Sequence, residues 1–229
     1  ICGLHVKQEH VTSALNKSKS GAIQEGNVGG GTGMLTYEFK GGTGTSSRLV
    51  QIGERQYTVG ALVQSNFGMR RDFSLLGVPV GQHMKENAVL TEMLAHEAGS
   101  IIVVIGTDLP LSPTQLRRIA KRGALGIGRT GTPGGHYSGD IFLAFSIAND
   151  LGLPGMSAEQ PATYSLTCIN DHYFDDIYLS TVQAIEEAII NAMVAAESMT
   201  TIKPPGYTVE AIDHAKLKEV MRRHNRLNE

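Results

Sequence analysis

The stretch GSIIVVIGTD, which runs from Gly99 to Asp108, is the most informative part of this sequence for its architecture. Its centre, from Ile101 to Ile105, is a continuous run of β-branched residues. Such a run predicts a strand that is buried on both faces, as in the middle of an α/β domain. We therefore expect Ser100 to open a central strand of the fold.

The segments after this strand alternate between helical and strand patterns, which indicates an α/β domain. Ser112 followed by Pro113 is a typical helix start, because serine caps the first turn and proline fits its first position. We expect helices over Pro113–Leu125, Ile177–Ser198 and Val209–Arg223, a strand over Ile141–Ile147, and a glycine-rich loop over Gly126–Gly139.

The segments before the strand are rich in glycine and in short β patterns. We expect a helix over Val11–Leu15, glycine-rich loops over Gly26–Met34 and Lys40–Arg48, strands over Leu35–Phe39, Arg48–Ile52, Tyr57–Ser65 and Phe73–Val80, and an exposed linker over Gln82–Gly99. The glycines indicate backbone that packs closely against something, with amides free to point inward. Ordinary tight turns are the alternative explanation.

Composition excludes several classes of function. The chain has 229 residues and a net charge of −2, and its basic residues form no cluster typical of nucleic-acid binding. No apolar run approaches the roughly 18 residues of a membrane helix. Cys2 and Cys168 lack metal-site spacing, and they favour a reduced, cytoplasmic setting. Because the chain opens on apolar residues at Ile1, we expect that an N-terminal portion, with any site residues in it, is missing.

Two other binding functions fit the sequence poorly. Gly126–Gly131 (GIGRTG) matches the G-x-G-x-x-G pattern of dinucleotide sites, but it follows a predicted helix and leads into Thr132-Pro133. A dinucleotide site needs the pattern between a strand and a helix. The histidines show no metal motif, and the acidic cluster Asp171–Asp176 is typical of a solvated loop. We expect neither a cofactor nor a metal.

The Gly99–Ser100 pair is suited to self-cleavage. Glycine offers an unhindered carbonyl, which the Ser100 hydroxyl can attack in an N→O acyl shift. Hydrolysis of the resulting ester frees the Ser100 amine, whose ordinary pKa of about 7.7–8.0 suits it as the base for its own hydroxyl. A Gly-Ser pair before a strand is common, however, so the pair alone is not specific.

Taken together, five stretches resemble the L-aminopeptidase/D-esterase family, peptidase family S58, which includes the β-peptidyl aminopeptidases. They are Gly26–Met34 (GNVGGGTGM), Phe39–Arg48 (FKGGTGTSSR), Val59–Gly68 (VGALVQSNFG), Gly99–Asp108 (GSIIVVIGTD) and Arg129–Ser146 (RTGTPGGHYSGDIFLAFS). The resemblance implies a four-layer αββα sandwich of the self-cleaving N-terminal-nucleophile type. It also implies a cut between residues 1–99 and 100–229, whose products stay associated as one domain, and assembly into a homo-oligomer.

The resemblance also implies roles for site residues. Ser100 matches the nucleophile, Ser138 and Asp140 match a supporting serine–carboxylate pair, and Asn66 matches an oxyanion donor. Several relatives carry glutamate at the position of Asp140, so the reach of this carboxylate differs. The pair either assists proton transfer, anchors the substrate ammonium or tunes the Ser100 amine.

These roles lead to a functional hypothesis. We expect an aminopeptidase or amidase that releases N-terminal residues from small peptides, amides or esters through an acyl-enzyme on Ser100. One alternative is an acyltransferase resembling the ornithine acetyltransferases, although those use a threonine nucleophile. The other is a non-catalytic binding protein, and the joint presence of Ser100, Ser138, Asp140 and Asn66 argues against it.

Overall fold

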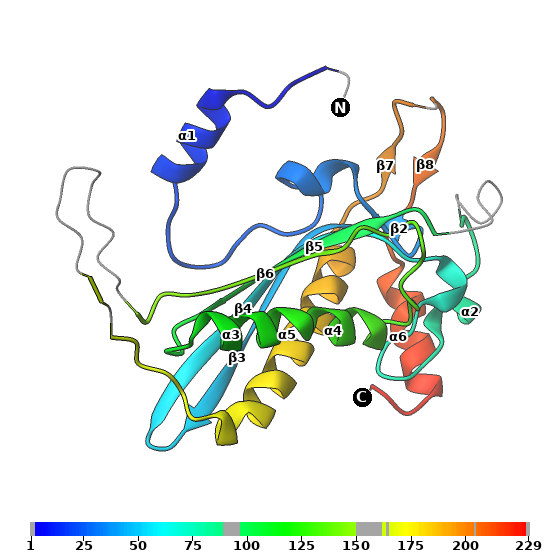
Figure 1. Ribbon diagram of the computed structural model, residues 1–229. Coiled ribbons are helices and arrows are strands. Elements are labelled where there is room, and N and C mark those ends of the chain that lie inside the picture. The colour runs from blue at the N-terminus through cyan, green and yellow to red at the C-terminus, as the bar shows by residue number, and fades with distance from the viewer. Residues whose placement is uncertain (1–2, 89–96, 150–161, 164, 204, 228–229) are drawn as a thin grey trace.

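The computed structural model describes residues 3–88, 97–149, 162–163, 165–203 and 205–227. A four-stranded sheet forms its centre, with helices packed against one face (Figure 1). The strand order is β3 (Gly42–Ile52), β4 (Arg55–Asn66), β5 (Ser100–Thr107) and β6 (Ile141–Ser146). β4 pairs antiparallel with both β3 and β5, whereas β6 runs parallel to β5. The predicted central strand from Ser100 is confirmed.

β5 is buried on one face of the sheet only. Ile101 and Ile105 are each 1% exposed, while Ile102, which points to the opposite face, is 45% exposed. Leu143 and Phe145 of β6 are also exposed. The prediction of burial on both faces is therefore wrong for the described residues, because successive side chains of a strand point to opposite faces and the described helices cover only one face of the sheet.

The long helix α5 (Phe174–Val194) covers the buried face of β3 and β4. Its side chains Ile185, Ala188 and Ile189 are fully buried against the sheet. The helix α5 approaches β3 very closely at Gly44, since a Cβ at this position would lie 1.9 Å from the Ala188 carbonyl oxygen. This contact explains a correction: the predicted glycine loop Lys40–Arg48 lies mostly within β3, where glycine makes room for the helix.

Two shorter helices, α3 (Pro113–Lys121) and α4 (Gly123–Arg129), carry the chain from β5 back to β6. The expected cap of α3 is present, with the Ser112 hydroxyl accepting the Gln115 N–H. The single helix predicted to Leu125 is wrong, because α3 ends at Lys121 and α4 begins at Gly123, where a Cβ would lie 2.0 Å from the Phe142 ring. The start of the predicted Gly126–Gly139 loop is consequently helical.

Two further strand predictions need correction. The predicted strand Leu35–Phe39 is split into β1 (Leu35–Thr36) and β2 (Phe39–Lys40), because Tyr37 and Glu38 adopt positive φ angles of 51° and 63° in the turn between them. Phe73–Val80 forms no strand: it contains an isolated bridge between Leu75 and Val78, and its last residue, Val80, begins a short helix.

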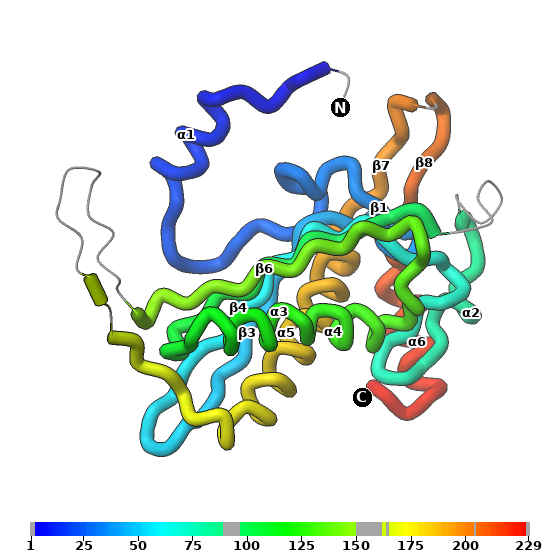
Figure 2. The backbone as a smooth tube through the Cα atoms, viewed as in Figure 1, coloured from blue at the N-terminus to red at the C-terminus, as the bar shows by residue number. Residues whose placement is uncertain are grey.

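The remaining elements lie around the sheet. They are α1 (Gln8–Asn16), the 3-10 helices Gly29–Gly33, Arg70–Asp72 and Asp171–Tyr173, α2 (Val80–His83), β7 (Met199–Thr200), β8 (Thr208–Val209) and α6 (His214–Arg223). α1 lies apart from the sheet on its uncovered side and has no buried residue (Figure 2). The predicted exposed linker is wrong at its start, where Met84 is buried, and residues 89–96 of it lie outside the described residues. None of the described helices combines the length and apolarity needed to cross a membrane.

Candidate active site

The pairing of β4 with β5 sets Asn66 beside Ser100. Asn66 is the last residue of β4, Ser100 is the first of β5, and the two are direct partners in the antiparallel register. Side chains of direct partners project on the same side of a sheet, with Cα atoms about 4.5–5.5 Å apart. The predicted oxyanion donor and nucleophile are therefore neighbours.

The orientation of the Asn66 amide is fixed by a hydrogen bond at its oxygen. The backbone N–H of Leu35 donates to Asn66 Oδ1 over 3.0 Å. Since the oxygen end is held by β1, the NH₂ end of the amide is the end that can donate to a developing negative charge.

The Ser100 hydroxyl lies against the segment that enters β6. The backbone N–H of Gly139 donates to Ser100 Oγ over 2.9 Å. This contact follows from the parallel pairing of β5 with β6, in which Ile102 lies opposite Ile141.

The two residues on either side of Gly139 form the predicted serine–carboxylate pair. The Ser138 hydroxyl donates to Asp140 Oδ1 over 2.6 Å, and the Ile101 N–H donates to the same oxygen over 3.1 Å. The carboxylate is thus bonded to the residue that follows the nucleophile. The structure brings all four predicted residues together.

Position 99 requires glycine for a second reason, besides the unhindered carbonyl that glycine offers: the backbone of a neighbouring segment leaves no room for a side chain. A Cβ at Gly99 would lie 2.2 Å from the Asn66 carbonyl oxygen and 2.8 Å from the Phe67 Cα. Both contacts are with backbone, so a side chain cannot be accommodated by a simple rotamer change.

Sequence reasoning missed a buried lysine, Lys40, that helps to position Asn66 by holding the chain that leads to Leu35. Lys40 is 1% exposed, and its Nζ donates to the carbonyl oxygens of Gly31, Met34 and Gly41. Burial lowers the pKa of Lys40 to about 8. These bonds fix the chain that leads into Leu35, whose N–H holds Asn66. A lysine at the start of the predicted loop Lys40–Arg48 gave no sequence signal for this role.

A second missed residue is Glu97, which lies three positions before Ser100. Its Oε1 accepts the Gly68 N–H over 2.8 Å, and its Oε2 accepts the Thr132 hydroxyl over 2.9 Å. The sequence placed Glu97 in the expected linker, and only the folded chain brings its two partners together.

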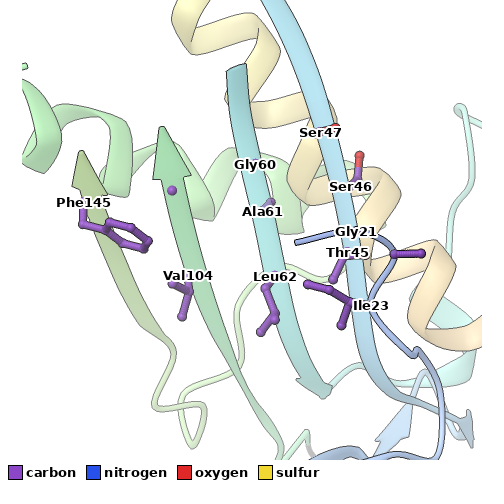
Figure 3. A pocket seen from close by; sticks show the side chains of 12 residues that line it. Gly21, Ile23, Thr45, Ser46, Ser47, Gly60, Ala61, Leu62, Val104 and Phe145 are labelled. Atoms are coloured by element: carbon purple, nitrogen blue, oxygen red, sulfur yellow. The ribbon is translucent and has the colours of Figure 1, made fainter. Parts of the chain in front are cut away.

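The uncovered sheet face carries an open groove of about 470 Å³. Leu62, Val104 and Phe145 line its floor, and Ile23 lies at its edge (Figure 3). Val104 is four residues beyond Ser100, which corresponds to about 13 Å along a strand. The groove is therefore separate from the nucleophile. Within the described ranges, no group of His, Cys, Asp and Glu side chains is arranged to hold a metal ion.

Comparison with known proteins identifies the family. A family model for peptidase family S58 matches residues 1–205. The chain belongs to peptidase family S58. Among curated S58 relatives, the β-peptidyl aminopeptidases BapA of Sphingosinicella microcystinivorans and Sphingosinicella xenopeptidilytica are 43% and 41% identical over 99% and 97% of this chain. The chain spans 59% and 56% of the length of these relatives.

Solved structures agree with this assignment. The L-aminopeptidase D-Ala-esterase/amidase of Ochrobactrum anthropi, described as a variant of the Ntn-hydrolase fold, is 48% identical with a TM-score of 0.90. It is matched over 99% of this S58 chain and 60% of its own. A Burkholderia β-aminopeptidase is 39% identical with a TM-score of 0.83, over 97% and 60% of the two chains. The predicted N-terminal-nucleophile fold is confirmed, and the described residues supply one large sheet and one helical layer of the sandwich.

Proposed function

We propose that the complete protein is a self-cleaving serine aminopeptidase or amidase with Ser100 as its nucleophile. The observation that carries this proposal is the contact of the Ser100 hydroxyl with the Gly139 N–H, beside the Ser138–Asp140 pair and opposite Asn66. A strand-opening serine held by these groups, in a chain of this family, supports nucleophilic catalysis.

The first reaction is the cut between Gly99 and Ser100. Ser100 Oγ attacks the Gly99 carbonyl carbon, an ester bond forms, the amide C–N bond breaks, and the hydroxyl proton passes to the departing amine. Water then hydrolyses the ester, which leaves a carboxylate on Gly99 and restores the Ser100 hydroxyl beside a new α-amine. Residues 1–99 and 100–229 stay together because β4 and β5 remain paired.

The second reaction repeats the same chemistry on a substrate. The new amine accepts the hydroxyl proton, Ser100 Oγ attacks the carbonyl of the substrate's N-terminal residue, and the leaving amine or alcohol takes the proton. The amide NH₂ of Asn66 donates to the oxyanion, an interaction typically worth about 3–4 kcal/mol of barrier. Water then releases the N-terminal residue from the acyl-enzyme.

The Ser138–Asp140 pair supports these steps by holding the nucleophile. Asp140 accepts the N–H of Ile101, the residue bonded to Ser100, while Ser138 donates to the same carboxylate oxygen. We assign the pair to the positioning and charge balance of the Ser100 amine.

The names of the relatives suggest the substrate class. A β-peptidyl aminopeptidase and an L-aminopeptidase D-Ala-esterase/amidase are among the matches, so short peptides, amides and esters with a free amine are proposed here too. We also propose that the protein assembles as a homo-oligomer.

The test is the mass of the purified complete protein under denaturing conditions, with N-terminal sequencing of each fragment. Two fragments are expected, one of which begins Ser-Ile-Ile-Val-Val. Ser100→Ala should yield a single chain without activity on aminoacyl p-nitroanilides. A Ser100→Ala protein that is cut or active contradicts the proposal. A cut protein that transfers acyl groups but does not hydrolyse these substrates favours the acyltransferase alternative.

A further inference from the structure

The carboxylate of Glu97, three residues before Ser100, joins two segments of the candidate active site, which we call its walls. One wall is the end of β4, where Gly68 follows Asn66 by two residues, and its N–H donates to Glu97 Oε1 over 2.8 Å. The other wall is the loop that leads to Ser138, where the Thr132 hydroxyl donates to Glu97 Oε2 over 2.9 Å. Each carboxylate oxygen therefore binds a different wall.

Both partners of Glu97 are themselves held by one buried residue, Tyr37. The Tyr37 hydroxyl accepts the Thr132 N–H over 3.1 Å and lies 2.7 Å from the Thr130 hydroxyl. The Tyr37 ring packs so tightly on Gly68 that a Cβ there would lie 2.5 Å from it. Burial raises the pKa of Tyr37 well above its ordinary value, so the phenol stays neutral and keeps these bonds. Glu97 therefore binds donors of fixed position.

The chain between Glu97 and Ser100 has little freedom. Gly99 lies against the backbone of Asn66 and Phe67, and Ser100 is paired with Asn66 in the sheet. With Glu97 bonded at one end and Ser100 paired at the other, the scissile peptide bond is held from both sides. An intramolecular attack depends steeply on such alignment, and a displacement of about 1 Å can cost roughly 100-fold in rate.

We propose that Glu97 is a positioning residue for self-cleavage, which aligns the Gly99 carbonyl with the Ser100 hydroxyl. The inference rests on the proposed function, because it concerns the same cut. Glu97 does not touch the reacting atoms. Its effect passes through the segment from Glu97 to Ser100, so it should act on the maturation step more strongly than on substrate turnover.

The experiment follows the cut in the complete protein. Newly synthesised wild type, Glu97→Ala, Glu97→Gln and Thr132→Val are sampled over time, and the uncut fraction is measured by denaturing mass spectrometry. Glu97→Ala should cut about 10- to 100-fold more slowly than wild type. Glu97→Gln should recover part of the rate, because its amide oxygen still accepts the Gly68 N–H. Thr132→Val should fall between wild type and Glu97→Ala. Glu54→Gln, on the exposed turn between β3 and β4, is the matched control and should cut at the wild-type rate.

A second readout separates positioning from general damage. Once fully cut, the Glu97 variants should lose much less in kcat than in the rate of the cut, and their melting temperature should stay near that of wild type, whereas misfolding would lower kcat, melting temperature and cutting together. If Glu97→Ala does not fold, Glu97→Gln and Thr132→Val carry the test. Wild-type cutting rates in these variants overturn the inference and leave the proposed function intact. An uncut wild type, or a cut Ser100→Ala, overturns the proposed function instead.

Discussion

Asn66, at the end of β4, is the direct antiparallel partner of Ser100, at the start of β5. Eight consecutive pairs, from Val59–Thr107 to Asn66–Ser100, set this register. A slip of one residue would turn the Asn66 side chain to the other face of the sheet. The sheet register thus determines whether the Asn66 amide lies beside Ser100, where the proposed oxyanion would form, and the following substitutions test this arrangement.

The substitution Asn66→Asp should distinguish the role of the amide oxygen of Asn66 from the role of its NH₂ group. The aspartate keeps an oxygen for the Leu35 N–H but lacks the NH₂ donor, so kcat should fall about 100- to 1,000-fold with little change in KM. Self-cleavage should slow as well, because it passes through an oxyanion of the same kind. Steady-state kinetics on an aminoacyl p-nitroanilide provides the measurement. If Asn66→Asp is as active as wild type while Asn66→Ala is not, the amide serves only to hold Leu35.

Asp140→Asn tests the role of the serine–carboxylate pair. The single amide oxygen cannot supply the charge that Asp140 places beside Ile101, so both the rate of the cut and kcat should fall by about 10- to 100-fold. Ser138→Ala should have a smaller effect in the same direction, since Asp140 keeps the Ile101 N–H. Steady-state kinetics that gives kcat and KM separately distinguishes a role in the reaction from a role in binding the substrate ammonium. A rise in KM alone would assign the pair to the substrate ammonium.

Gly99→Ala should strongly slow the cut through sterics. The new Cβ would press on the backbone of Asn66 and Phe67, and relief requires the segment to shift away from Ser100. Gly128→Ala is the control, because nothing lies within 4 Å of its Cβ in α4. That variant should cut normally and gain about 0.5–1 kcal/mol of stability from its helical position. Equal cutting rates in the two variants would show that the close approach at Gly99 is unimportant.

Lys40 makes the stability of the folded state increase as the pH becomes alkaline. Its pKa is about 8 in the fold against 10.5 when exposed. Between these values the unfolded chain binds more protons than the folded chain, so the contribution of Lys40 to stability rises as pH increases from 8 to 10.5. The free energy of unfolding of wild type relative to Lys40→Met should therefore increase by up to about 1.4 kcal/mol per pH unit in this window. It should be constant below pH 8.

Urea unfolding at several pH values from 7 to 9.5 measures this difference. Lys121→Met, at an exposed position of α3, controls for the loss of a lysine. Parallel stability curves for wild type and Lys40→Met would contradict the assignment.

The strand that begins at Ser100 could be predicted from the sequence alone, because β-branched residues favour strands wherever they pack. Motif resemblance supplied Asn66, Ser138 and Asp140, which strand pairing brings together. Glycine content was misleading at Gly44, where it predicted a loop because glycine disfavours strands locally, whereas the carbonyl of Ala188 on α5 leaves room for no other residue at this position of β3. Here a tertiary contact overrides local propensity.

Glu97 and Lys40 were beyond sequence reasoning for a different reason. The role of each residue can be identified only from its hydrogen-bond partners, and those partners lie on other segments of the chain. Glu97 binds Gly68 and Thr132, which are separated from it by 29 and 35 positions. A charged residue in a polar stretch has the same local pattern whether it is solvated or anchored, so only the folded structure distinguishes the two.

The parallel pairing of β5 with β6 has a consequence for the order of events during synthesis. The strands are joined through α3 and α4, a loop of about thirty residues whose closure is slow and entropically costly compared with a hairpin. Gly139 and Asp140 reach Ser100 only after that closure. In the proposed mechanism, a nascent chain that has not yet paired β5 with β6 lacks the contacts that Gly139 and Asp140 make at Ser100 and Ile101. We therefore expect the two fragments to appear only after this closure.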